Sequence, residues 1–473
     1  MRPSSWKLAR KEPYFQEVES MGTRLLATSS RALAVLLAGA GIGCLVQLGT
    51  VRLIGAESFG IFAYAIAWTT VLGYIATLGF HVSLLRLLPA YQVGEDWARA
   101  KAVLRFATGV TVIAGVVLAL AAAGAALVVH GPEGELGRTL LIGAAVVPLL
   151  ALRLVGSAAV RAFGGVIASM LPERILRDSL AFGFLGLAVT TGLMVADAFT
   201  AMLGMLGAAL ITLWYLKRVL AARRPAELAS ALHVYSPRDW LLPAVPLTAI
   251  MLADTLMSRA GPLVIGTRGE TIEAGIFAVA FGLAQLAALP RMSVSSLFAP
   301  TVSALYHKGD TSGLHQIIGR SAMLSLFGTV AVAVPLILGA PILLPWFGPE
   351  FVRAEPILLV LVIGQLAAGA AGPQQHLLTM TGHERQGAAL MVAAAAGNVI
   401  GATVLYASFG MMGVAVASSL SVVAWNIGMI WFLNRRLKLR PGLAYAPGLL
   451  REAFARAFPG TGSSGDKPQE QQP

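Results

Sequence analysis

Charged residues are scarce in this sequence: Asp, Glu, Lys and Arg make up 12% of its 473 residues, about half the share of a soluble domain. Apolar residues make up 57%, which at about 20 residues per membrane-spanning helix is material for about twelve spans. These residues stand in unbroken runs, whereas strands of a membrane β-barrel alternate apolar and polar residues. The sequence therefore predicts an all-α polytopic membrane protein without a large domain outside the membrane.

Several signatures of site chemistry are also missing. Cys44 is the only cysteine, and the seven histidines show no spacing that suits a metal site. There is no G-x-x-x-x-G-K-[ST] loop for nucleotide phosphates and no catalytic constellation. We therefore expect no enzyme, no catalytic residue, no metal and no cofactor.

Basic residues are distributed unevenly around the apolar runs. The runs long enough to cross a membrane cover residues 32–54, 59–80, 104–129, 140–163, 178–195, 198–216, 239–262, 275–300, 320–345, 355–377, 387–408 and 411–433. With the N-terminus inside, 28 of the 35 Lys and Arg residues lie in inside segments and 5 in outside segments. Positive charge accumulates on the cytoplasmic side, so we expect both termini in the cytoplasm. The same rule accounts for the net charge of +12, which gives no indication of nucleic acid binding.

The chain divides into two halves of six runs each. We expect a cytoplasmic segment at 1–30, an N-terminal lobe at 31–216, a cytoplasmic linker at 217–238, a C-terminal lobe at 239–434 and a cytoplasmic tail at 435–473, disordered from about 459. The motif Gly-Ile-Phe-Ala at 60–63 recurs at 275–278, and seven identities fall in the 35 positions from 60 to 94 at the same offset. With an even number of spans per half, this repeat predicts two six-helix lobes related by a pseudo-twofold axis along the membrane normal.

Three glycine-containing stretches carry a family resemblance. They are residues 53–62 (LIGAESFGIF), residues 253–257 (ADTLM) with 273–277 (EAGIF), and residues 380–383 (MTGH) through Asn398 to 409–417 (FGMMGVAVA). By the order and topology of these stretches, the chain resembles bacterial polysaccharide-biosynthesis flippases. This family is the oligosaccharide branch of the multidrug/oligosaccharidyl-lipid/polysaccharide exporter superfamily. The resemblance covers residues from about 25 to 440. The resemblance implies a flippase in the bacterial cytoplasmic (inner) membrane that moves undecaprenyl-pyrophosphate-linked oligosaccharide by alternating access for O-antigen, capsule or exopolysaccharide assembly.

Arginines within and beside the spans are candidate substrate ligands. Arg153 lies near the middle of the fourth run and Arg291 behind a kink expected at Pro290, whereas Arg52, Arg259 and Arg86 lie at span ends. A guanidinium group binds phosphate oxygens bidentately and keeps its charge, which suits a pyrophosphate. The alternative for the three residues at span ends is interfacial snorkelling.

Asp254 is the one carboxylate predicted well inside a span. It is a candidate H⁺ or Na⁺ coupling site, with Asn398 as an additional polar ligand. The alternatives are a structural ion pair between Asp254 and a neighbouring Arg such as Arg259, and an interhelical hydrogen bond for Asn398.

Two other functions compete with the flippase. A drug/cation antiporter of the same superfamily should have an acidic cavity, and a membrane glycosyltransferase or polymerase of the same pathway should have carboxylate clusters or large outside loops. The partners expected for the flippase are the lipid-linked oligosaccharide and membrane lipids, with the polymerase and chain-length machinery as candidate protein partners and no nucleic acid.

Overall fold

The computed structural model describes residues 12–230, 234–308, 311–372, 374, 377–378 and 384–437. The tail expected to be disordered and the motif at 380–383 lie outside these residues. All regular structure within them is helical. In chain order the elements are α1 (Glu12–Ala76), α2 (Phe80–Val93), α3 (Trp97–His130), α4 (Glu135–Ala162), α5 (Val166–Leu171), the π-helix η1 (Pro172–Leu176), α6 (Arg177–Thr190), α7 (Ala198–Arg223), α8 (Ala226–Ser230), α9 (Pro237–Gly266), α10 (Thr271–Leu286), α11 (Leu289–Lys308), α12 (Thr311–Leu343), the 3₁₀-helices η2 (Leu344–Trp346) and η3 (Pro349–Ala354), α13 (Glu355–Ala371) and α15 (Glu384–Leu437).

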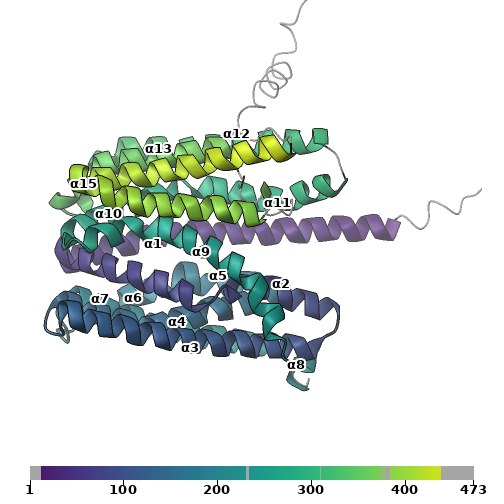
Figure 1. Cartoon of the computed structure of the whole chain (residues 1–473), viewed down its shortest axis with the longest axis horizontal. Coiled ribbons are helices and arrows are strands. Elements are labelled where there is room, and N and C mark those ends of the chain that lie inside the picture. Colours follow the sequence, from purple (N-terminus) through teal and green to yellow (C-terminus); the bar gives the residue numbers. More distant parts are fainter. Residues whose placement is uncertain are drawn as a thin grey trace, which may run out of the picture.

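Two of the long helices each contain a sharp bend at a glycine. Gly55 in α1 has φ 79° and Gly410 in α15 has φ 56°, values in the left-handed region that favours glycine. Each bend joins two of the predicted spans with almost no loop. The bend of α1 and the loops that join α3 to α4, α6 to α7 and α9 to α10 lie at one end of the molecule, which we call the Gly55 end (Figure 1). Helix α2 marks the opposite end, which we call the α2 end.

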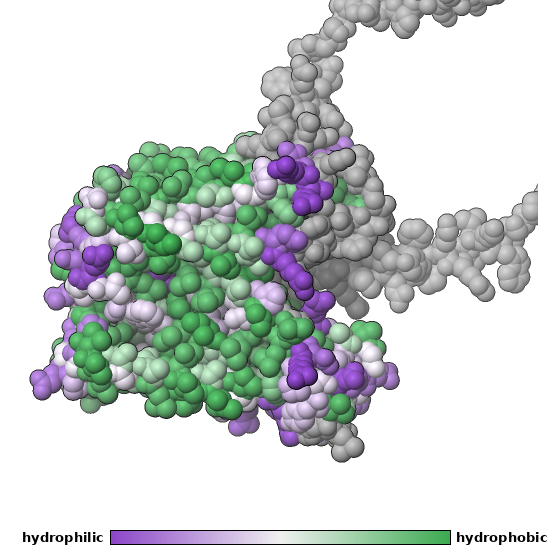
Figure 2. Space-filling view, viewed as in Figure 1, coloured by the Kyte–Doolittle hydropathy of each residue, from purple (hydrophilic) through white to green (hydrophobic). Residues whose placement is uncertain are grey.

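Where the structure describes it, each predicted apolar run lies mainly on helix, and the prediction of an all-α polytopic membrane protein is confirmed. Eight helical stretches of the described chain are long and apolar enough to cross a membrane, and a ninth is formed if α10 and the start of α11, bent by 43°, are one span. Two of the eight stretches contain the bent helices α1 and α15. Figure 2 shows apolar residues covering the sides of the body and polar residues gathered at its two ends, as a bilayer requires.

The helices form two lobes that lie one above the other in Figure 1. Helix α4 packs against α3 and α7 in the N-terminal lobe, and α15 packs against α9 and α13 in the C-terminal lobe. The first half of the chain therefore forms one lobe and the second half forms the other. The lobes meet where α1 packs against α9 and α10.

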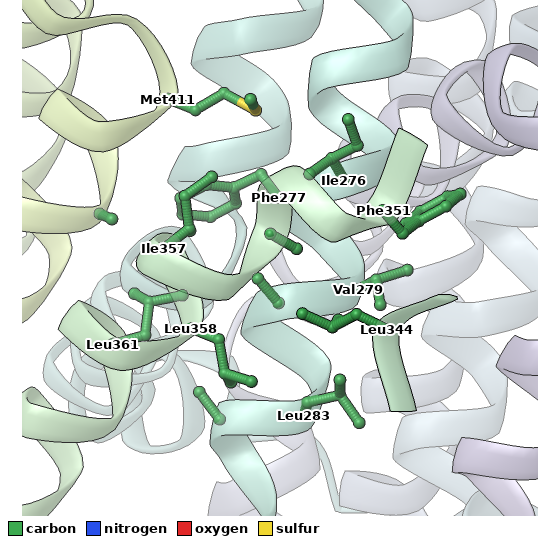
Figure 3. Close-up of a cluster of buried hydrophobic side chains, with 14 of the residues drawn as sticks. Ile276, Phe277, Val279, Leu283, Leu344, Phe351, Ile357, Leu358, Leu361 and Met411 are labelled. Carbon is green, nitrogen blue, oxygen red and sulfur yellow. The ribbon is translucent and has the colours of Figure 1, made fainter. Parts of the chain in front are cut away.

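The largest apolar cluster of the described residues joins the lobes at the Gly55 end. At the Gly55 end a single cluster of buried side chains includes Phe59 of α1 and a large part of the C-terminal lobe. Figure 3 shows its members from α10, η2, η3, α13 and α15. At the α2 end there are two separate clusters, with Leu84 and Leu88 in one and Met429 and Leu433 in the other. From the C-terminal lobe, Trp240 at the start of α9 packs in the first of these clusters. The described lobes are thus closed against each other at the Gly55 end.

The two copies of the repeat touch at this closed end. A Cβ atom placed on Gly275 of α10 would lie 3.1 Å from both the Cα and the N of Gly60 in α1. The equivalent glycines of the two halves therefore form a backbone crossing between the lobes. Nearby, the ring of Phe59 meets that of Phe351 edge-on at 6.5 Å.

Candidate functional site

A cavity of about 490 Å³ lies between the two lobes. Helices α1, α4, η1, α6 and α7 form the wall on the N-terminal side, and α9 and α10 form the wall on the C-terminal side. We call it the central cavity. Because both lobes contribute to it, a movement of one lobe relative to the other would change its shape and its access.

A break in the fifth span supplies much of the charge in this cavity. Pro172 interrupts the ordinary helical hydrogen bonds, and the N–H of Arg177 instead donates to the carbonyl of Pro172, five residues earlier. The irregular segment places Glu173, Arg174 and Asp178 on the cavity wall with Arg177. Irregular backbone at membrane depth is tolerated where it is buried in protein or lines a cavity.

The central cavity has an excess of positive charge. Its charged lining residues are four arginines and two carboxylates: Arg153, Arg174, Arg177, Arg259, Glu173 and Asp178. An anion entering the cavity would be attracted, because opposite charges interact more strongly in a low-dielectric site than in water.

Both carboxylates already have arginine partners. The Nε of Arg177 donates to Asp178 Oδ1 at 2.6 Å, and Arg161 Nη2 lies 3.5 Å from Glu173 Oε2. In contrast, Arg153 Nη1 and Arg259 Nε are buried without a hydrogen-bond partner among the described residues. Arg153 is 2% exposed. A buried donor without a partner costs about 1–3 kcal/mol, so an anion that accepts these hydrogen bonds would be stabilised.

A second, smaller cavity of about 100 Å³ lies within the C-terminal lobe, and we call it the side cavity. Asp254 of α9 and Arg291 of α11 both line it, so the arginine that shares a cavity with Asp254 is Arg291, not Arg259. Ser258 and Phe281 line both cavities. The two cavities are therefore neighbours with a common wall.

The other predicted site residues lie outside both cavities. Arg52 is exposed at the Gly55 end, where it donates to the backbone carbonyls of Trp346 and, at 3.5 Å, Pro345 in the other lobe. Arg86 is exposed on α2. Asn398 is fully buried; its Nδ2 donates to the Met257 carbonyl at 3.2 Å, and its Oδ1 accepts from Ser418 at 3.4 Å.

Four charged residues of the central cavity were not among the predicted site residues: Glu173, Arg174, Arg177 and Asp178. The sequence prediction placed 164–177 in an inside loop, since the apolar run begins only at 178. One signal could have found them, because Glu173 with Arg177 and Arg174 with Asp178 are opposite charges at i,i+4 spacing, a pattern typical of helix. Arg259 was expected at a span end, but α9 continues to Gly266, almost two turns further.

The chain belongs to the polysaccharide biosynthesis protein family, whose model matches residues 25–306. It is also similar to the uncharacterized membrane protein EpsK of Bacillus subtilis (strain 168), with 28% identity over 137 residues. That match spans 28% of this chain and about a quarter (27%) of the length of EpsK.

Solved structures with the same fold are membrane transporters. A multidrug resistance MATE family transporter of the MOP superfamily, in an inward-facing conformation, matches with a TM-score of 0.68 and 16% identity over 86% of this chain and 98% of its own. The lipid II flippase MurJ, in an inward closed conformation, matches with a TM-score of 0.64 and 14% identity over 91% of this chain and 93% of its own. At these identities the similarity shows the fold alone, an all-α membrane fold with two lobes.

Proposed function

We propose that this protein is a flippase that carries undecaprenyl-pyrophosphate-linked oligosaccharide across the cytoplasmic membrane by alternating access, for the assembly of a surface polysaccharide. The observation that carries the proposal is the pair Arg153 and Arg259. Both line the cavity between the lobes, and each has a buried N–H group that finds no hydrogen-bond partner in the described part of the chain. A pyrophosphate is the part of such a substrate that costs most to move through hydrocarbon. Guanidinium groups can replace its hydration shell with charge-assisted hydrogen bonds.

The arrangement of the lobes supports access from one side at a time. The lobes share a large apolar core at the Gly55 end, whereas at the α2 end the two clusters are separate and the start of α9, through Trp240, is the part of the C-terminal lobe that packs on the N-terminal cluster. With the termini in the cytoplasm, the α2 end faces the cytoplasm, where the lipid-linked sugar is made, so the state described is closed to the outside. Separation of the lobes at the Gly60–Gly275 crossing, with closure at the α2 end, would open the central cavity to the outside.

Energy for the movement comes from an ion gradient, from the membrane potential or from consumption of the product outside, because the chain has no nucleotide-binding loop. The excess of arginine in the central cavity also disfavours the drug/cation antiporter, since an organic cation would meet net positive charge. In this proposal the protein acts as a transporter and not as an enzyme.

Binding of undecaprenyl pyrophosphate to the purified protein in nanodiscs tests the proposal. Loss of one charge-assisted hydrogen bond costs about 1.5–3 kcal/mol, so Arg153→Gln and Arg259→Gln should each weaken binding about ten- to a hundredfold. Arg218→Gln is the matched control, because Arg218 lies exposed over the ring of Trp214 and outside the cavity. Wild-type affinity in both cavity variants, at normal protein level and with normal surface polysaccharide in cells, would contradict the proposal.

The membrane orientation has its own test. Glu133 and Glu350 are exposed at the Gly55 end, and Ala222 is exposed near the end of α7 at the α2 end. Single cysteines at 133 and 350 should react with a membrane-impermeant maleimide added to intact cells, and a cysteine at 222 should react only after lysis. Reaction of position 222 in intact cells would place the termini outside.

A further inference from the structure

The side cavity differs in chemistry from the central cavity. Its polar groups include one carboxylate, one guanidinium and two amides, from Asp254, Arg291, Gln285 and Gln365, and the ring of Trp425 forms part of its wall. This set offers both hydrogen-bond donors and acceptors, and its one negative group is balanced by one positive group. The central cavity instead offers mainly positively charged hydrogen-bond donors. The side cavity therefore suits a neutral ligand rich in hydroxyl groups better than a second phosphate.

Several of these groups have unused hydrogen-bonding capacity. Gln365 Nε2 donates to Gln285 Oε1 at 3.0 Å, which leaves Gln365 Oε1 buried without a partner among the described residues. The Nε of Arg291 is likewise buried without a partner among these residues. Asp254 is solvent-accessible and lines the side cavity. Buried polar atoms are normally satisfied, so these groups indicate a ligand or water that accepts from Arg291 and donates to Gln365.

The position of the side cavity relates it to the central cavity. Ser258 on α9 and Phe281 on α10 line both, so groups bound in the two cavities would lie next to each other. A lipid pyrophosphate that carries sugars has this shape, an anionic group followed at once by hydroxyl-rich rings. Sugar hydroxyls donate to carboxylates and amide oxygens and accept from guanidinium N–H groups, and the C–H face of a sugar ring packs on an aromatic side chain.

We propose that the side cavity is a carbohydrate subsite, in which Asp254, Arg291 and Gln365 hydrogen-bond the hydroxyl groups of the sugar attached to the pyrophosphate. The inference rests on the proposed function, because it takes the pyrophosphate to lie in the central cavity. It assigns recognition of the pyrophosphate to the cavity between the lobes and recognition of the sugar to the C-terminal lobe. In this role Asp254 contacts the substrate, whereas as a coupling group it would bind H⁺ or Na⁺.

Binding of two kinds of lipid, a bare lipid and its sugar conjugates, measured side by side in nanodiscs, tests the subsite. The probes are undecaprenyl pyrophosphate alone and its conjugates with a single glucose, galactose or N-acetylglucosamine. Wild-type protein should bind at least one conjugate more tightly than the bare lipid. Gln365→Leu and Asp254→Asn, which alter two different helices, should each weaken that conjugate about five- to fiftyfold and leave the bare lipid unchanged.

The bare lipid is the internal control for folding, and the outcomes separate the two proposals. Arg153→Gln should weaken the bare lipid and the conjugate alike. If both lipids fail to bind the wild-type protein, the proposed function is wrong and the subsite with it. If the bare lipid binds but Gln365→Leu and Asp254→Asn bind the conjugates as the wild type does, the subsite alone is wrong. A loss of Na⁺ or pH dependence in Asp254→Asn with unchanged sugar preference would also overturn it, in favour of ion coupling.

Discussion

The crossing of Gly60 and Gly275 holds the lobes in backbone contact at the Gly55 end, and a methyl group at Gly60 should force this contact open. An added Cβ at Gly60 would overlap the backbone carbonyl of Thr271, far inside the ordinary carbon–oxygen contact of about 3.3–3.6 Å. A backbone atom cannot rotate away as a side chain can. The overlap is therefore relieved only by separating α1 from α10.

The size of the effect follows from the cost of overpacking. Extra methyl groups in a well-packed contact cost about 1–3 kcal/mol. Because this cost applies to the state closed at the Gly55 end, the ratio of closed to open molecules in Gly60→Ala should fall about five- to 150-fold. A protein closed at this end should therefore become open there in a large fraction of molecules.

Distances between spin labels can report the shift. Cys44 is replaced by serine first, since it is the only native thiol. Labels at Leu193 and Phe409, both exposed at the Gly55 end of opposite lobes, should move apart in Gly60→Ala. Labels at Val93 and Arg436, exposed at the α2 end, should approach each other.

The control is another helical glycine replaced by alanine. A Cβ at Gly397 of α15 would meet nothing within 4 Å, so Gly397→Ala should leave both distances unchanged. Identical distance distributions in Gly60→Ala and the wild type, for folded and monodisperse protein, would refute the reasoning. A shift of equal size in Gly397→Ala would refute it as well.

Two further predictions concern residues that lie outside both cavities. Arg52→Ala removes the hydrogen bonds to the Trp346 and Pro345 carbonyls, which are worth about 1.5–3 kcal/mol. This change should also lengthen the distance between spin labels at the Gly55 end. Weaker binding of undecaprenyl pyrophosphate without a longer distance would favour a substrate contact instead. Asn398→Leu removes two buried hydrogen bonds at about 0.6–1.7 kcal/mol each and should lower the thermal unfolding midpoint without altering ion dependence. Unchanged stability with lost dependence on Na⁺ or pH would contradict this and support ion coupling.

The sequence alone determined the class of fold. The length and apolarity of each run are local properties, and a helix in a bilayer satisfies its own backbone hydrogen bonds, so the runs and their helical state could be predicted without knowing how they pack. The repeat likewise predicted two lobes, since equivalent segments such as 60–63 and 275–278 adopt equivalent positions. Bends at Gly55 and Gly410 replaced loops because glycine tolerates the left-handed region.

The composition of the cavities was decided by tertiary structure. Arg259 and Arg52 were both predicted at span ends, yet one lines the central cavity and the other bonds to carbonyls of the opposite lobe. Asp254 shares the side cavity with Arg291, 37 positions away in the sequence. Which face of a helix meets a cavity depends on the rotation of that helix and on the helices opposite it. Those are contacts between distant parts of the chain, and no local pattern of charge or apolarity contains them.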